Sequence, residues 1–138
     1  MPTTTEFNVQ MEDRPGTLAE LSRALADESV NIIGFQSHPS QEKGKGELHL
    51  LVDNPAAAKT VLDNQGLKYR ETEVAKAKLP NRPGALARVA DKLGEANINI
   101  DYSYTAMESG TNDPVLIFGV KDARKAASIL DEAVKAAA

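Results

Sequence analysis

An internal repeat constrains the fold of this chain more than any other feature. Residues 13–32 read DRPGTLAELSRALADESVNI, and residues 81–100 read NRPGALARVADKLGEANINI. The two segments align without a gap at an offset of 68 residues, and eight of twenty positions are identical. Two copies are too few for a solenoid, which needs at least about three stacked repeats. We therefore expect two paired domains, over residues 1–72 and 73–138.

The first copy shows a clear succession of strand and helix patterns. Residues 6–11 alternate polar and apolar side chains, which predicts a strand with one buried face. Proline suits the first turn of a helix, so a helix is expected to start at Arg14-Pro15-Gly16-Thr17 and to carry an apolar stripe of leucines. The other expected elements are strands over residues 31–38, 47–52 and 67–72 and a helix over residues 53–66.

The second copy repeats this succession. The expected elements are a strand over residues 74–79, a helix over 83–96 with Leu86, Val89 and Leu93 inward, strands over 98–107 and 115–120, and a helix over 122–136. No clear fourth strand follows. The order βαββαβ defines an α+β, ferredoxin-like module with an antiparallel sheet and both helices on one face. Residues 67–80 are compatible with one nearly continuous strand that ends the first module and opens the second.

At this point the chain resembles the ACT-domain family. The resemblance rests on a strand, then (Asn/Asp)-Arg-Pro-Gly-x-Leu, then a helix, then (Val/Ile)-Asn-Ile at the start of the next strand, and it occurs twice. The family implies regulation of amino-acid metabolism, with amino acids or similar effectors bound where modules meet. Because no catalytic domain is attached, the chain is similar to stand-alone tandem ACT proteins. We expect an allosteric regulator rather than an enzyme, without a cofactor.

The resemblance also indicates candidate ligand-binding residues. In serine-sensing members of the family, the Asn before Arg-Pro-Gly and the Asn that opens the second strand contact the effector. Those positions are Asn81 and Asn99 in the second copy, and Asp13 and Asn31 in the first. A family histidine two residues before the first Asn is replaced by an apolar residue in both copies, which argues against serine itself.

The loops between strand and helix have chemistry suited to an amino acid. A helix N-terminus offers unpaired N–H groups and partial positive charge to a carboxylate. Glycine has no side chain to block a close approach of the backbone. The candidate site therefore consists of Asn81, Arg82, Pro83, Gly84, Ala85 and Asn99 in the second copy, with Asp13, Gly16 and Asn31 in the first.

Simpler interpretations of these residues stay open at this level. Asp13 and Asn81 also suit helix caps. Asn31 and Asn99 also suit backbone hydrogen bonds at the start of a strand, and the loop arginines suit solvated surface charges. A ligand-free module that docks on a metabolic enzyme or a transcription factor is the alternative function.

Composition argues against several other classes of function. The net charge is −4, whereas nucleic-acid binding needs a basic surface. Cysteine is absent, and His38 and His49 are expected on different strands, where isolated histidines are usually not metal ligands. No segment approaches the roughly 20 apolar residues of a membrane span, and the N-terminus lacks a secretory pattern. We expect a cytoplasmic protein that binds no metal, nucleic acid or membrane.

Two further expectations concern association and site choice. Val115 and Ile117 should face away from the helices and need cover, so we expect a homodimer. At the candidate loops, the carboxylate of Asp13 would repel an incoming carboxylate, whereas the neutral amide of Asn81 would not. The effector is therefore expected mainly at the second loop. Asn81→Ala should weaken binding roughly tenfold or more, and Asp13→Ala should leave it nearly unchanged.

Overall fold

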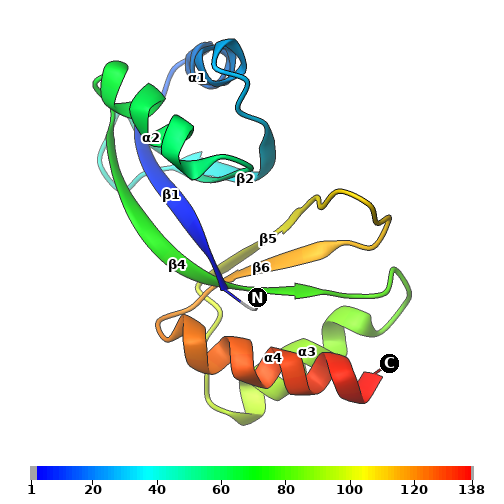
Figure 1. The fold of residues 1–138 in the computed structure, drawn as a ribbon. Coiled ribbons are helices and arrows are strands. Elements are labelled where there is room, and N and C mark those ends of the chain that lie inside the picture. The colour runs from blue at the N-terminus through cyan, green and yellow to red at the C-terminus, as the bar shows by residue number, and fades with distance from the viewer. Residues whose placement is uncertain (1–2, 138) are drawn as a thin grey trace. The chain divides into compact units, whose positions relative to one another are not determined.

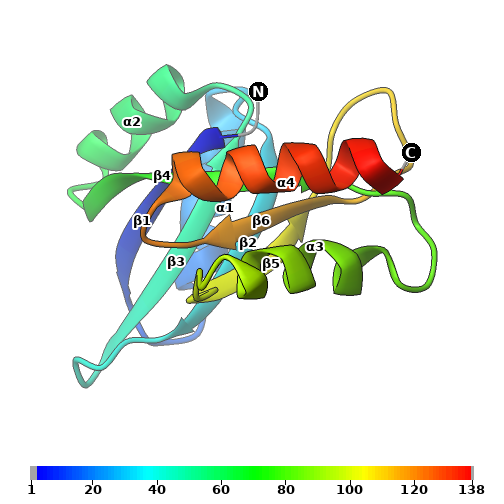
Figure 2. The same cartoon turned by 90° about the horizontal axis from the view of Figure 1, so that it is seen from below.

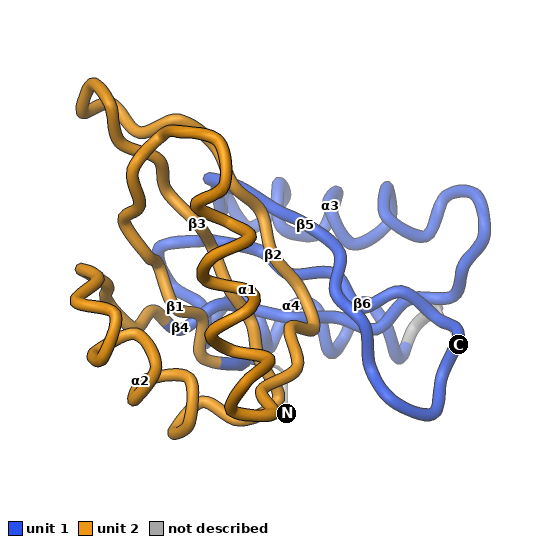
Figure 3. Tube along the Cα trace, turned by 90° about the horizontal axis from the view of Figure 1, so that it is seen from above, with its two compact units in different colours: residues 1–4, 73–138 blue, residues 5–72 orange. Residues whose placement is uncertain are grey.

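The computed structural model describes residues 3–137 and shows an α+β fold with antiparallel strand pairing. The chain divides into two compact units (Figure 3). The N-terminal unit comprises residues 5–72, and the C-terminal unit comprises residues 73 onward together with Thr3 and Thr4. In chain order the elements are β1 (Thr3–Glu12), α1 (Thr17–Asp27), β2 (Ile32–Pro39), β3 (Lys45–Val52), α2 (Pro55–Asn64), β4 (Lys68–Lys78), α3 (Ala85–Glu95), β5 (Tyr102–Ala106), β6 (Val115–Gly119) and α4 (Ala123–Ala137).

In the N-terminal unit, β3 lies between β1 and β2 and pairs antiparallel with both. Leu50 of β3 is opposite Phe7 of β1 and Phe35 of β2. The helices α1 and α2 lie on the same side of these strands (Figure 1). Alternate residues of β1 and β3 meet the helices in one hydrophobic core, whose buried members are Phe7, Val9, Met11, Leu21, Leu25, Val30, Leu48, Leu50, Val52, Ala58, Val61 and Leu62.

The expectation that β1 buries only one face was wrong. Residues 6 to 9 are all buried, although they point alternately to opposite faces. Phe7 and Val9 belong to the core under the helices. On the other face, Glu6 is buried beside His49 of β3, and the two side chains are hydrogen-bonded. Because these polar residues lie on a buried face, the sequence of β1 alternates in the same way as that of a strand with one exposed face.

In the C-terminal unit, β6 pairs antiparallel with β4 and with β5, so that Phe118 is opposite both Ala75 and Ser103. The helices α3 and α4 contact each other and run side by side (Figure 2). This unit has its own core, whose buried members are Ala75, Ala77, Leu79, Val89, Leu93, Phe118, Val120, Ala123, Ala126, Ala127, Leu130 and Ala133. The helix α4 extends to Ala137, the last residue that the structure describes.

The strand β4 runs unbroken from Lys68 to Lys78. The border between the two units falls inside it, between Thr72 and Glu73. The expectation of one continuous strand in this region is confirmed.

The two repeated helices start later than expected. Proline was expected in the first helical turn, but α1 begins at Thr17 and α3 at Ala85, after Gly16 and Gly84. These glycines have φ angles of 93° and 89°, in the left-handed region that disfavours any residue with a side chain. Neither helix has a side-chain cap hydrogen bond, so the cap interpretation of the preceding Asp and Asn was also wrong.

Other differences occur in the C-terminal unit. The strand expected over residues 98–107 is shorter, because Ile98 and Ile100 pack against the core before regular pairing starts at Tyr102. Leu86 was expected to face inward but is 55% exposed. Val115 and Ile117, which were expected to need cover from a second copy, are 6% and 1% exposed in the single chain. Their burial therefore needs no partner, and the homodimer stays a prediction.

Candidate functional site

A cavity of ≈ 280 Å³ lies beside the Arg-Pro-Gly loop of the C-terminal unit. Its size is close to the lower end of the roughly 300–1,000 Å³ usual for small-molecule pockets. The end of β4, the loop, the first turns of α3 and the residue Val134 of α4 form its walls. The lining residues are Lys78, Leu79, Pro80, Arg82, Pro83, Ala85, Arg88, Val89, Asp113 and Val134.

This cavity contains only part of the site expected from the sequence. Arg82, Pro83 and Ala85 line it, whereas Asn81 and Asn99 are not among its lining residues. Both asparagines are exposed, and the Asn99 amide donates a hydrogen bond of 2.8 Å to Asp101. The structure therefore does not bring the two amides together in a pocket. Gly84 shapes the loop through its left-handed backbone rather than by lining the cavity.

The N-terminal unit has an equivalent but smaller cavity of ≈ 210 Å³. Six of its lining residues stand at the 68-residue offset from lining residues of the larger cavity, which makes the two cavities counterparts. The corresponding pairs are Met11 and Leu79, Glu12 and Pro80, Arg14 and Arg82, Thr17 and Ala85, Glu20 and Arg88, and Leu21 and Val89.

The remaining residues expected at the first loop do not line this cavity. The backbone N–H of Asp13 donates to the carbonyl of Gly44 at 3.0 Å, and the Asp13 side chain is exposed. The N–H of Asn31 donates to the carboxylate of Asp53 at 2.9 Å, which ties the start of β2 to the end of β3. Gly16 acts through its backbone conformation at the start of α1.

The two counterpart cavities differ most in charge. In the N-terminal unit, Arg14 forms ion pairs of 3.0 Å with Glu12 and 3.2 Å with Glu20. The hydrogen bond to Glu12, followed by that to Glu20, raises the pKa of Arg14. In the C-terminal unit, Pro80 and Arg88 replace these two acids. Two acidic residues and one basic residue thus line the first cavity, whereas three basic residues and one acidic residue line the second.

The basic residue Lys78 of the second cavity takes part in an ion pair of 3.3 Å with Glu108. Arg82 and Arg88 carry planar guanidinium groups, whose geometry suits bidentate recognition of a carboxylate. Asp113 is the single acid in the lining, so the cavity presents groups for both charges of a zwitterion.

The N-terminal unit also contains a cluster of the polar side chains Glu6, His49 and His38, which was not predicted from the sequence. Glu6 Oε1 lies 3.0 Å from His49 Nδ1, and His49 Nε2 lies 3.1 Å from His38 Nε2. The Nδ1 atom of His38 lies 3.0 Å from the carbonyl oxygen of Pro39. The two histidines come together because β2 and β3 form a hairpin, and only the hairpin register could have revealed this from the sequence.

Within residues 3–137, no group of three or more His, Cys, Asp or Glu side chains could hold a metal ion. No helix in this described part of the chain is long and apolar enough to cross a membrane.

Comparison with known proteins finds a family match in the first part of the chain. Residues 5–63 match the model of the ACT domain. No curated protein matches the chain.

Solved structures with the same fold cover nearly the whole chain. Protein BT0572 from Bacteroides thetaiotaomicron has 25% sequence identity and a TM-score of 0.80, with 94% of this chain and 88% of that chain covered. The ligand-free regulatory subunit of aspartate kinase from Thermus thermophilus has 15% identity and a TM-score of 0.62, with 96% and 97% covered. A structure of aspartokinase alpha and beta subunits has 14% identity and a TM-score of 0.59, with 98% of both chains covered.

Proposed function

We propose that this chain is a regulatory protein with two ACT modules that senses an amino acid, and that the C-terminal unit is the second module. Three features support a second module. The units share the succession strand, helix, strand, strand, helix. Both repeated helices start after a left-handed glycine. Both units have a cavity at corresponding positions beside this helix start.

The effector binds in the cavity of the C-terminal unit. The observation that carries this proposal is the replacement of Glu12 and Glu20 by Pro80 and Arg88. In the N-terminal unit the two glutamates neutralise the loop arginine, Arg14. In the C-terminal unit the same positions leave a basic lining that attracts a carboxylate.

The other lining residues define the rest of the effector. Asp113 is placed to receive an ammonium group, because it is the acid of this lining. Leu79 and Val89 are buried apolar residues at the wall of the cavity, and they favour an apolar side chain. The effector is therefore an amino acid with a small or medium apolar side chain. The similarity in fold to a regulatory subunit of aspartate kinase is in keeping with a regulatory role.

Thermal denaturation in the presence of each proteinogenic amino acid tests this proposal. A ligand at about 100 times its dissociation constant should add roughly 2.7 kcal/mol to the free energy of unfolding. Arg88→Glu introduces the acid found in the counterpart cavity and should weaken binding about tenfold or more. Arg23→Glu makes the same change of charge at an exposed site that lines neither of the two counterpart cavities, and should leave binding unchanged.

The outcome separates the proposal from its alternative. Equal loss in both charge variants would show a general charge effect and contradict this location of the site. If no amino acid raises the melting temperature, the ligand-free interaction module becomes the better interpretation. The variants Asn81→Ala and Asp13→Ala test whether the effector also contacts the exposed part of either loop. Loss of affinity in Asn81→Ala alone means that the effector extends from the cavity to the exposed part of the loop.

We also propose that the chain forms a homodimer, because a twofold dimer is the commonest oligomer of soluble proteins. Sedimentation velocity at micromolar concentration measures this directly. A single species with the mass of one chain would contradict it.

A further inference from the structure

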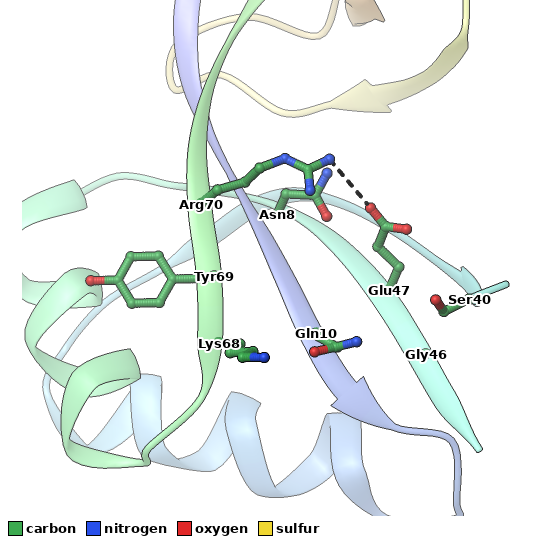
Figure 4. Close-up of a pocket in the computed structure, with 8 residues that line it drawn as sticks. All are labelled: Asn8, Gln10, Ser40, Gly46, Glu47, Lys68, Tyr69 and Arg70. Atoms are coloured by element: carbon green, nitrogen blue, oxygen red, sulfur yellow. Dashed lines mark ion pairs between the residues drawn. The ribbon is translucent and has the colours of Figure 1, made fainter. Parts of the chain in front are cut away.

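The N-terminal unit contains a second, more polar cavity on the sheet face that does not pack against α1 and α2. On β1, Val9 points into the core, whereas Asn8 and Gln10 point to the opposite face. Gln10 is opposite Glu47 of β3. The cavity has a volume of ≈ 470 Å³ and is lined by Asn8, Gln10, Ser40, Gly46, Glu47, Lys68, Tyr69 and Arg70 (Figure 4).

The side chain of Asn8 lines this cavity. Asn8 is only 6% exposed, so the cavity is the space in which its amide can meet a small molecule. The amide has donors and an acceptor, so it can recognise a hydroxyl, an amine or a carboxylate.

Charged groups of both signs converge near Asn8. Figure 4 shows the side chain of Arg70 extending from β4 over Asn8 toward Glu47. Arg70 Nη2 forms an ion pair of 3.7 Å with Glu47 Oε1, which is longer than a hydrogen bond. Lys68 lies two residues away on the same strand and points to the same cavity. Two basic residues and one acid therefore line it.

The neighbouring polar residues are already occupied. The phenol of Tyr69 points away from the cavity and donates a hydrogen bond of 2.7 Å to Asp63 (Figure 4). The Gln10 amide donates to Glu42 at 2.9 Å. A ligand would therefore meet Asn8 and Lys68 and would replace the long ion pair between Arg70 and Glu47.

We infer that this cavity is a second small-molecule site, specific for a polar carboxylate that carries an amino or hydroxyl group. Arg70 and Lys68 bind the carboxylate, and Glu47 accepts a hydrogen bond from the amine or hydroxyl group. Asn8 completes the shell with its buried amide. The lining is polar, in contrast to the apolar wall of Leu79 and Val89 in the effector cavity, so the two sites select different ligands. This inference does not depend on the proposed function.

Nuclear magnetic resonance of ¹⁵N-labelled protein tests it, with L-glutamine and L-malate as probes and L-valine as an apolar comparison. We expect L-glutamine or L-malate to shift the Asn8 side-chain amide resonances saturably, whereas L-valine does not. Arg70→Gln should lower the affinity about tenfold or more. Arg124→Gln is the matched control, because Arg124 is also an exposed arginine paired with a glutamate, and it lines no part of the cavity.

Two results would overturn the inference. One is the absence of any saturable shift with either polar probe at millimolar concentration. The other is an unchanged affinity in Arg70→Gln. The variant Arg88→Glu distinguishes this site from the effector cavity, since binding of the polar probe should survive in it. Loss of polar-probe binding in Arg88→Glu alone would mean that the probe occupies the effector cavity instead.

Discussion

The buried pair of Glu6 and His49 offers the sharpest test of the fold. Their side chains are 0% and 4% exposed, and Glu6 Oε1 lies 3.0 Å from His49 Nδ1. Removing one partner leaves the other as a buried polar group without this bond, which costs about 1–3 kcal/mol. We therefore expect Glu6→Met and His49→Leu each to lower the free energy of unfolding by about 2 kcal/mol. For a protein of this length, this corresponds to a fall of roughly 6–10 °C in melting temperature.

The double variant makes the test specific. When both polar partners are replaced by apolar groups of similar shape, the loss can be nearly neutral. Glu6→Met combined with His49→Leu should therefore be more stable than the sum of the single losses predicts, by about 1 kcal/mol or more. Urea denaturation followed by circular dichroism measures all four proteins. Glu95→Met, which removes the exposed 3.4 Å ion pair with Lys92, is the control and should cost less than about 0.5 kcal/mol.

Additive losses in the double variant would refute this reasoning. So would single losses no larger than that of the exposed control. Either result would mean that Glu6 and His49 do not depend on each other in the folded protein.

Two other predictions concern a phenol and a glycine. The hydrogen bond to Asp63 raises the pKa of Tyr69 to about 12. Because this is above the usual value near 10, the stabilising contribution is complete below about pH 10 and is lost as the pH rises toward 12. A phenolate absorbance titration should show a transition near pH 12 that disappears in Tyr69→Phe. Gly84→Ala should cost roughly 1–2 kcal/mol through its φ of 89° alone, because no atom lies within 4 Å of the added Cβ. Gly94→Ala, inside α3, should instead stabilise the protein slightly in the same denaturation assay.

The elements of the fold could be predicted from the repeat, but the helix starts could not. Proline is common in the first helical turn, and Pro15 and Pro83 therefore suggested an early start. The left-handed conformation of the following glycines determines where each helix starts, because it turns the chain before the helix begins. A Pro-Gly sequence is compatible with both arrangements, so the pattern alone does not distinguish them.

The side chains of the candidate site could likewise be predicted from the sequence only in part. The repeat located the loop that lines the effector cavity, including Arg82, Pro83 and Ala85. The decisive charge difference involves Glu20 and Arg88, which lie six residues after the loop arginines. Their contact with the loop depends on the direction of the first helical turn, which is a three-dimensional property. The Asn8 amide could not be recognised either, because its burial requires knowledge of both sheet faces.

The continuous strand β4 has a consequence for how the length of this chain can change. Leu67 and Tyr69 pack against the first core, and Ala75 and Ala77 belong to the second. All four are odd-numbered, and the exposed residues Glu71 and Glu73 lie between them at the border. An insertion or deletion of one residue at Thr72 would reverse the faces of every following side chain in the strand. We therefore expect substitutions at the exposed positions of this segment to be tolerated better than a change in residue number.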